Sequence, residues 1–161
     1  MPFDDRLRTL RETLVLDHFR DEVRQDFDSV LATFPHPRYE IIATGEVYDG
    51  RAEVESYYAA TRRAFPDQRH EMIALRHAED AVITEFWLLG THLGSLQGIP
   101  PTGKAFRVRM TAYFIFEDER LVCERIYFDV LSMLRQLLEG APPAVLQAAL
   151  AGVLGSTGAR P

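Results

Sequence analysis

The most informative chemical group in this sequence is an acid that closes an apolar run. Asp129 directly follows Ile126-Tyr127-Phe128. A carboxylate taken out of water without partners is strongly penalised, so Asp129 is exposed, is paired, or is kept because its proton is used. A carboxylate and an imidazole are the ordinary pair for moving a proton at neutral pH, and His92 is the histidine that we expect nearest to it. We therefore expect Asp129 and His92 to act as the catalytic acid and base.

Two alternatives accompany that expectation. Arg125 shares a strand face with Asp129 if the run is extended, and a guanidinium that reached Asp129 would lower the pKa of this carboxyl and weaken its acid role. A lone histidine on a strand is more often a hydrogen-bonded packing residue, so the alternative for His92 is a purely structural role.

Composition limits the other classes of function. The 161 residues have a formal net charge of −6 and no block of Lys or Arg, which argues against nucleic acid or an anionic membrane as partner. The single cysteine, Cys123, excludes an intrachain disulfide, and no Cys/His cluster has the spacing of a zinc site. The first residues do not read as a signal peptide, and no apolar run approaches the ~20 residues of a membrane span. We expect a cytoplasmic protein without metal or cofactor.

The elements that must position these residues follow from periodicity. Helical spacing covers residues 4–34, with a break near 20–25, and returns at 51–65, while 39–47 alternates as a strand does. Four further runs rich in β-branched and aromatic residues predict consecutive antiparallel strands: 69–76, 81–93, 106–116 and 121–130. Helices first and strands afterwards predict one α+β domain, residues 1–139, with helices on the concave face of a curved antiparallel sheet. Residues 140–161 predict a short apolar helix, 145–154, that packs on a neighbour or subunit, and then a flexible tail.

Alternation predicts which faces point inward. In 106–116, Arg107 and Arg109 fall on the outer face, opposite an apolar set that faces core or cavity: Val108, Met110, Ala112, Phe114 and Phe116. In 81–93, the face that ends at His92 carries no charge before it: Val82, Thr84, Phe86, Leu88 and Gly90. For the last strand, parity leaves two choices, because Arg125, Tyr127 and Asp129 share one face while Glu124, Ile126 and Phe128 share the other.

Several short motifs together resemble a known family. They are Val47-Tyr48-Asp49-Gly50, Phe65-Pro66-Asp67, Gly90-Thr91-His92, Gly98-Ile99-Pro100-Pro101-Thr102-Gly103-Lys104, Tyr127-Phe128-Asp129 and Leu134-Arg135-Gln136-Leu137. In this combination the chain resembles the SnoaL-like polyketide cyclases, which belong to the nuclear-transport-factor-two-like superfamily. The resemblance spans about residues 31–138.

The resemblance implies a fold and a chemistry. The fold is a cone-shaped α+β barrel of the cystatin-like kind, with a deep apolar cavity and frequent dimerisation through the outer face of the sheet. The chemistry is a cofactor-free ring closure, similar to an intramolecular aldol reaction, on an apolar polycyclic or terpenoid-type molecule, with Asp129 moving the proton. The residues expected to bind that molecule are Tyr58, Phe86, Leu88, Met110, Phe114, Arg125 and Tyr127.

Other functions stay open at this point. Members of the superfamily also serve as ligand-binding dimers without chemistry, since a fold does not fix a function. Epoxide hydrolases of the superfamily need an additional Asp and Arg on an inner strand, where this sequence has the apolar Phe86 and Leu88. A ketosteroid-isomerase-like proton shuttle needs only one acid, although the sequence offers no clear second oxyanion donor.

Overall fold

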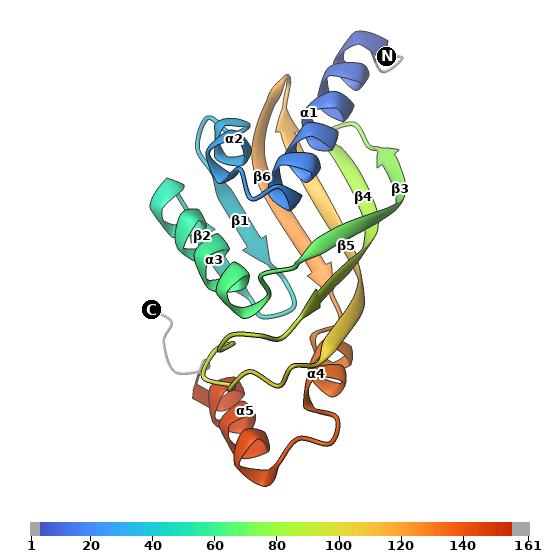
Figure 1. Ribbon diagram of the computed structural model, residues 1–161. Helices are drawn as coiled ribbons and strands as arrows, with labels where there is room; N and C mark the ends of the chain where they lie inside the picture. The colour runs from blue at the N-terminus through green and yellow to red at the C-terminus, as the bar shows by residue number, and fades with distance from the viewer. Residues whose placement is uncertain (1–3, 156–161) are drawn as a thin grey trace.

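The computed structural model describes residues 4–155, which form one sheet with helices on one side and at one end (Figure 1). The helices are α1 (Asp5–Val23), α2 (Phe27–Ala32), α3 (Arg51–Ala64), α4 (Val130–Leu138) and α5 (Pro143–Gly155). The strands are β1 (Arg38–Ile41), β2 (Glu46–Asp49), β3 (Arg69–His77), β4 (Ala81–Thr91), β5 (Ala105–Glu117) and β6 (Arg120–Phe128).

The six strands form one mixed sheet in the order β2-β1-β6-β5-β4-β3. The hairpins β3-β4, β4-β5 and β5-β6 are antiparallel, as their consecutive order predicts. The pair β1-β6 is parallel, with Tyr39 opposite Glu124 and Ile41 opposite Ile126, so the expectation of a wholly antiparallel sheet is wrong at this one pair. The parallel pair matters because it places Tyr39 beside the last strand from a distant part of the chain.

Two segments differ from the expected elements. The run 39–47 is two short strands joined by a turn at Gly45, whose φ of 73° suits glycine, and not one strand. The last strand ends at Phe128 because Asp129 begins helix α4, which periodicity did not predict. The expected break in the first helix is confirmed between Val23 and Phe27. The expected apolar helix near the C-terminus is present as α5, and the expected flexible tail, 156–161, lies outside the described residues.

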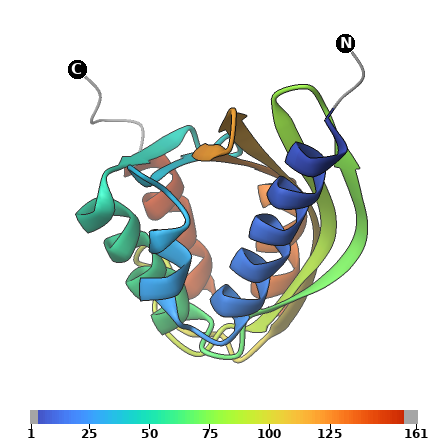
Figure 2. The same cartoon turned by 90° about the horizontal axis from the view of Figure 1, so that it is seen from above.

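The helices α1, α2 and α3 lie together over the concave face of the sheet (Figure 2). On α1, the buried residues are Arg11, Val15, His18, Phe19 and Glu22, which recur at helical spacing on one face. Leu16 and Val23 are exposed. The inward face of this helix therefore carries ionisable groups into the interior, and not only the apolar residues that the periodicity emphasised.

The inward faces of the central strands are as alternation predicts. Phe86, Leu88, Met110 and Phe114 are buried, and Arg107 and Arg109 lie outside, over the ring of Trp87. On β6, Glu124 pairs with Phe114 and Ile126 with Ala112, so the face that contains Glu124 is the inner one. No helix within residues 4–155 is long and apolar enough to cross a membrane.

Candidate active site

Asp129 is exposed and caps a helix. Its carboxylate accepts a hydrogen bond from the backbone N–H of Ser132 at 3.0 Å, which satisfies one of the free donors at the start of α4. No hydrogen bond or ion pair joins it to His92 or Arg125 among the described residues. An exposed side chain that caps a helix lies outside the interior and has a structural role, so this placement does not support the catalytic role expected for Asp129.

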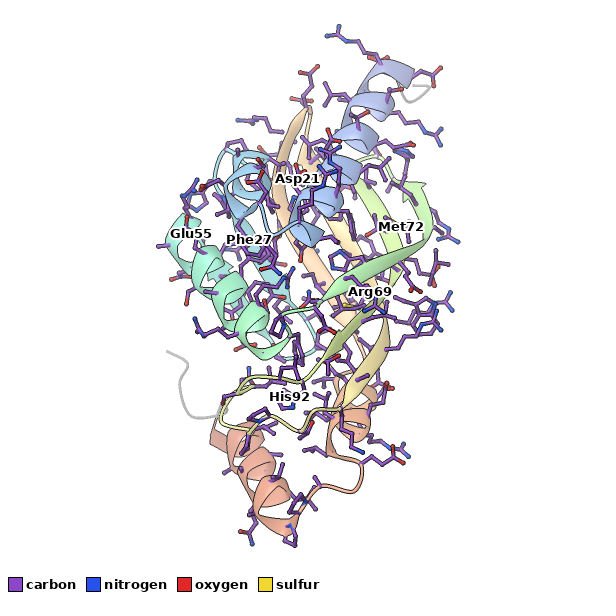
Figure 3. The ribbon with its side chains drawn as sticks, viewed as in Figure 1. Asp21, Phe27, Glu55, Arg69, Met72 and His92 are labelled. Carbon is purple, nitrogen blue, oxygen red and sulfur yellow. The ribbon has the colours of Figure 1, made fainter. Side chains whose placement is uncertain are left out.

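His92 is fully buried at the end of β4, in the lower part of the molecule in Figure 3. Its Nδ1 accepts a hydrogen bond from the backbone N–H of Thr102 at 3.3 Å, and its ring lies against Phe65. Burial lowers the pKa of His92, so the imidazole stays neutral near neutral pH. The hydrogen bond to Thr102 joins the two ends of the 92–104 loop. His92 therefore has the structural role that was its alternative in the sequence.

Arg125 and Tyr127 lie on the outer face of β6. Arg125 pairs with Glu40 on the neighbouring strand β1 at 2.5 Å, and Tyr127 is 41% exposed with its ring against Tyr113. Neither residue faces the interior, so the expectation that they bind the small molecule is not supported. The sequence left open an ion pair between Arg125 and Asp129. Arg125 instead pairs with Glu40. The other expected binding residues, including Tyr58, do face the interior.

The structure gathers a different set of polar side chains inside the cone. The cluster consists of His18 and Glu22 from α1, Tyr39 from β1, Tyr58 and Arg62 from α3, His70 from β3 and Glu124 from β6. Both tyrosines are 1% exposed, and none of the ionisable side chains is more than 11% exposed. Buried charge is rare and costly in a domain of this size, so we call these seven residues the interior cluster and treat them as the candidate active site.

His18 is the centre of the interior cluster. The Thr33 hydroxyl donates its hydrogen to the carbonyl of Val30 at 2.6 Å, so its oxygen is left to accept from His18 Nδ1 at 3.1 Å. That bond fixes the proton on Nδ1. The other nitrogen, Nε2, lies 3.0 Å from the Tyr39 hydroxyl and 3.2 Å from the Glu124 carboxylate. Nε2 therefore accepts from Tyr39 when His18 is neutral and donates to Glu124 when His18 is charged.

Tyr39 and Tyr58 form a pair of hydrogen-bonded phenols. Their hydroxyl oxygens are in direct contact, and the Tyr39 hydroxyl continues the chain to His18. Burial raises the pKa of both phenols well above the usual value, and the charges of Glu22 and Glu124 add to the effect. The two hydroxyls thus stay protonated and act as hydrogen-bond donors in a site without bulk water.

Glu22 and Arg62 form a buried ion pair beside these groups. An Arg62 guanidinium nitrogen lies 2.9 Å from Glu22 Oε1, and His70 Nε2 lies 3.8 Å from the same oxygen. Burial alone would raise the pKa of Glu22, but the nearby His70, Arg62 and His18 bring it below the ordinary value. Burial lowers the pKa of His70. Glu22 is therefore ionised near neutral pH, with Arg62 as its ion-pair partner.

His18 and Glu124 stand next to each other in the interior cluster. His18 Nε2 and Glu124 Oε2 lie 3.2 Å apart, so a proton can pass from one to the other. An imidazole and a carboxylate in contact in a buried site are the basic requirement for acid–base catalysis.

Three buried polar atoms of the interior cluster lack hydrogen-bond partners among the described residues. They are Arg62 Nε, His70 Nδ1 and Glu124 Oε2. Native interiors satisfy nearly all such groups, so several unsatisfied atoms in one interior need an explanation. These atoms are able to form hydrogen bonds to a bound molecule that offers both donors and acceptors.

Aromatic rings surround the interior cluster. His70 lies edge-on to Phe19 and Phe86 at 5.1 Å from each, and His18 lies edge-on to Phe114 at 5.3 Å. Phe27, at the start of α2 and labelled in Figure 3, has its ring stacked on Tyr58, with ring centroids 4.5 Å apart. The Arg62 guanidinium lies over the Phe27 ring. Phe27 is only partly buried, so we expect movement of its ring to open the interior cluster to a ligand.

Sequence reasoning passed over most of the interior cluster. A usable signal was the pair His18 and Glu22, which stand four residues apart on the same helical face as Val15 and Phe19. The inward direction of Glu124 depends on the strand's parity, which only the pairing with β5 settles. Arg62 and His70 come from separate elements, and no spacing in the sequence connects them to Glu22.

The described part of the chain contains no group of three or more His, Cys, Asp or Glu side chains arranged to hold a metal ion.

Comparisons with known proteins point to one family. Residues 14–137 match the sequence model of the SnoaL-like polyketide cyclases. No curated protein matches the chain in sequence.

Many solved structures share the fold. A candidate SnoaL-like polyketide cyclase from Jannaschia sp. CCS1 is 20% identical, with a TM-score of 0.75 over 89% of this chain and 97% of that one. IdmH, a candidate polyketide cyclase from Streptomyces antibioticus, is 23% identical, with a TM-score of 0.67 over 79% and 97%. A protein of ketosteroid-isomerase-like fold from Catenulispora acidiphila, solved with trimethylamine, is 19% identical, with a TM-score of 0.67 over 80% and 93%. At these identities the likeness concerns the fold.

Proposed function

Because the chain belongs to the SnoaL-like polyketide cyclase family, we propose that it closes a ring in an enolisable carbonyl compound inside the interior cluster, with Glu124 and His18 moving the proton. The observation that carries this proposal is the contact of 3.2 Å between His18 Nε2 and Glu124 Oε2, two side chains that are at most 5% exposed. The role given to Asp129 from the sequence thus passes to a buried acid five residues earlier.

The first step is removal of a proton from a carbon next to a carbonyl group. Glu124 Oε2 takes that proton, and the C–H electron pair becomes the enolate. The proton passes to His18 Nε2, and His18 becomes an imidazolium that faces the Glu124 carboxylate. The fixed Nδ1–H bond to Thr33 keeps the ring oriented throughout. Such positioned acid–base help supplies roughly 10²- to 10⁴-fold in rate.

The phenols then stabilise the enolate. When His18 Nε2 becomes protonated it no longer accepts from Tyr39, so the Tyr39 hydrogen is released toward the new negative oxygen. Tyr58 donates to Tyr39 and supports that charge. A donor that becomes available as charge develops acts on the transition state more than on the ground state.

Ring closure completes the reaction without any net gain or loss of atoms. The enolate carbon forms a bond to a second carbonyl carbon of the same molecule, whose oxygen becomes an alkoxide. The proton on His18 returns through Glu124 to that alkoxide, which restores both groups. The aromatic lining favours a folded, largely apolar substrate, and holding it near its reactive conformation contributes further to the rate.

The phenol pair also favours a second reaction class. A double-bond isomerase needs the same enolate and the same donors, but returns the proton to another carbon and forms no ring. Product analysis separates the two, because only the cyclase reaction creates a new carbon–carbon bond.

The experiment is a conversion assay on a panel of aromatic β-keto esters, with products identified by chromatography and NMR. We expect the wild-type protein to convert at least one member faster than buffer, and Glu124→Gln to lower kcat by about 10²- to 10⁴-fold with ligand affinity retained. The proposal fails if the wild type converts none of them, or if Glu124→Gln turns over at the wild-type rate.

We also propose that the outer face of the sheet pairs with a second copy. The support is the pair of exposed aromatic side chains Tyr113 and Tyr127, whose rings lie against each other on that face. Tyr113→Glu is expected to halve the mass measured in solution by light scattering. An unchanged mass rejects this interface.

A further inference from the structure

Helices α4 and α5 enclose a groove of about 940 Å³ that is separate from the interior cluster. Five of its eleven lining residues are leucines: Leu131, Leu134 and Leu138 on α4, and Leu146 and Leu150 on α5. Leu131 is 62% exposed and Leu150 60% exposed. A cluster of apolar side chains that are this exposed usually marks a surface that contacts another molecule.

Helix α5 lies outside the segment that matches the family. That match ends at residue 137, whereas α5 spans Pro143–Gly155 and contains no charged residue. A helix that is apolar all round is normally buried. On its own chain α5 packs by its small residues, because Ala149 is 5% exposed and a Cβ at Gly152 would come within 2.6 Å of the Gln97 carbonyl oxygen. The side of α5 that carries Leu146 and Leu150 is not covered by this packing and remains exposed.

Within residues 4–155 that side stays uncovered, since Leu146 is 45% exposed and Leu150 60% exposed. Helix α1 starts at the opposite end of the molecule from α5 (Figure 1). A separate molecule can therefore dock there.

The charged residues at the rim of the groove favour a second copy of this chain as the partner. Asp129, Arg135 and Glu139 all border the groove, so one small patch carries both signs. Two-fold rotation brings a patch against its own image, which lets Arg135 of each copy approach an acid of the other. The chain as a whole has a net charge of −6, so a mixed rim relieves the repulsion that two copies would otherwise meet.

We propose that the α4–α5 groove is a self-association surface in which Leu146 and Leu150 of each copy enter the groove of a second copy. The groove is lined by eleven residues, against about 20–30 per side in a standard interface. The association is accordingly weak, with a Kd in the micromolar range or above, and it adds to any pairing through the sheet.

Sedimentation velocity of the full chain from about 1 µM to about 1 mM tests this surface, since weak complexes dissociate within that range. The wild-type mass is expected to rise with concentration. Leu150→Glu on α5 and Leu131→Glu on α4 are each expected to raise the Kd at least ~10-fold, because either places a charge in the apolar groove. Gln147→Glu is the matched control: it adds the same charge to an exposed position of α5 that does not line the groove, and it keeps the wild-type behaviour.

All variants are also made in the Tyr113→Glu background, which separates this contact from pairing through the sheet, and circular dichroism checks their fold. The proposal is overturned if the Tyr113→Glu protein shows no concentration dependence. It is equally overturned if correctly folded Leu150→Glu and Leu131→Glu associate like their parent, or if Gln147→Glu dissociates as they do.

Discussion

Replacing Arg62 by Met tests whether the interior cluster is a coupled, buried set of charges. Arg62 is 7% exposed and pairs with Glu22, 11% exposed, at 2.9 Å. Removing one partner of a buried ion pair leaves the other charge uncompensated, which typically costs about 3–5 kcal/mol. His70 and His18 lie 3.8 Å and 4.0 Å from the Glu22 carboxylate and can partly compensate by taking up a proton. We therefore expect a loss near the lower end, about 3 kcal/mol.

The assay is urea unfolding at neutral pH, with thermal unfolding as a second measurement. For a chain of this length, about 3 kcal/mol corresponds to a Tm lower by about 6–12 °C. The double variant Glu22→Gln/Arg62→Met removes both charges and is expected to recover at least half of the loss, because no uncompensated charge remains. A single-variant loss below about 1 kcal/mol would refute the reasoning, since that is the size of a solvent-exposed pair. A double variant no more stable than the single one would also refute it.

Four further outcomes are expected. The free energy of unfolding should fall on acidification below about pH 6.5 and again below about pH 4.5, because folding lowers the pKa values of His70, His92 and Glu22 and the unfolded chain binds their protons first. His70→Gln should make the first fall smaller in urea titrations, with the remainder due to His92, and an unchanged profile would count against it. Asp129→Ala should cost about 0.5–2 kcal/mol in the same assay while Asp129→Asn costs little, since Asn also caps helices, and equal losses would argue against the cap. Tyr39→Phe should lower kcat more than it changes KM, and an effect on KM alone would contradict its role toward the enolate. Phe27→Ala should raise the association rate of any ligand in stopped-flow measurements, and an unchanged rate would place the entrance elsewhere.

Much of the fold follows from local patterns. The long strands 81–91 and 105–117 alternate cleanly because one face is buried, and helix α3 follows from its spacing and from the turn at Gly50. Helix α4 was missed because it begins within one residue of the last strand, at a capping Asp129 that also reads as the end of an apolar strand. The parallel pairing of β1 with β6 joins segments more than 80 residues apart and leaves no local trace.

The site was harder to predict than the fold, for a related reason. Alternation placed Phe86 and Phe114 correctly in the interior, since burial is a property of each strand. The chemistry depends on contacts between elements, such as His18 with Glu124, whose partners are brought together only by the packing of α1 on the sheet. The sequence led to Asp129 because its position at a strand end looked costly, whereas the cap at the start of α4 removes that cost.

The most direct measurement compares kcat for Glu124→Gln and Asp129→Asn on a substrate that the wild-type protein converts. Both changes remove one carboxylate with little change in shape, so they differ only in which acid is lost. The account predicts that Glu124→Gln loses about 10²-fold or more while Asp129→Asn stays within about 3-fold of the wild type. Loss of activity in Asp129→Asn with normal turnover in Glu124→Gln would contradict the assignment of the acid to the interior cluster.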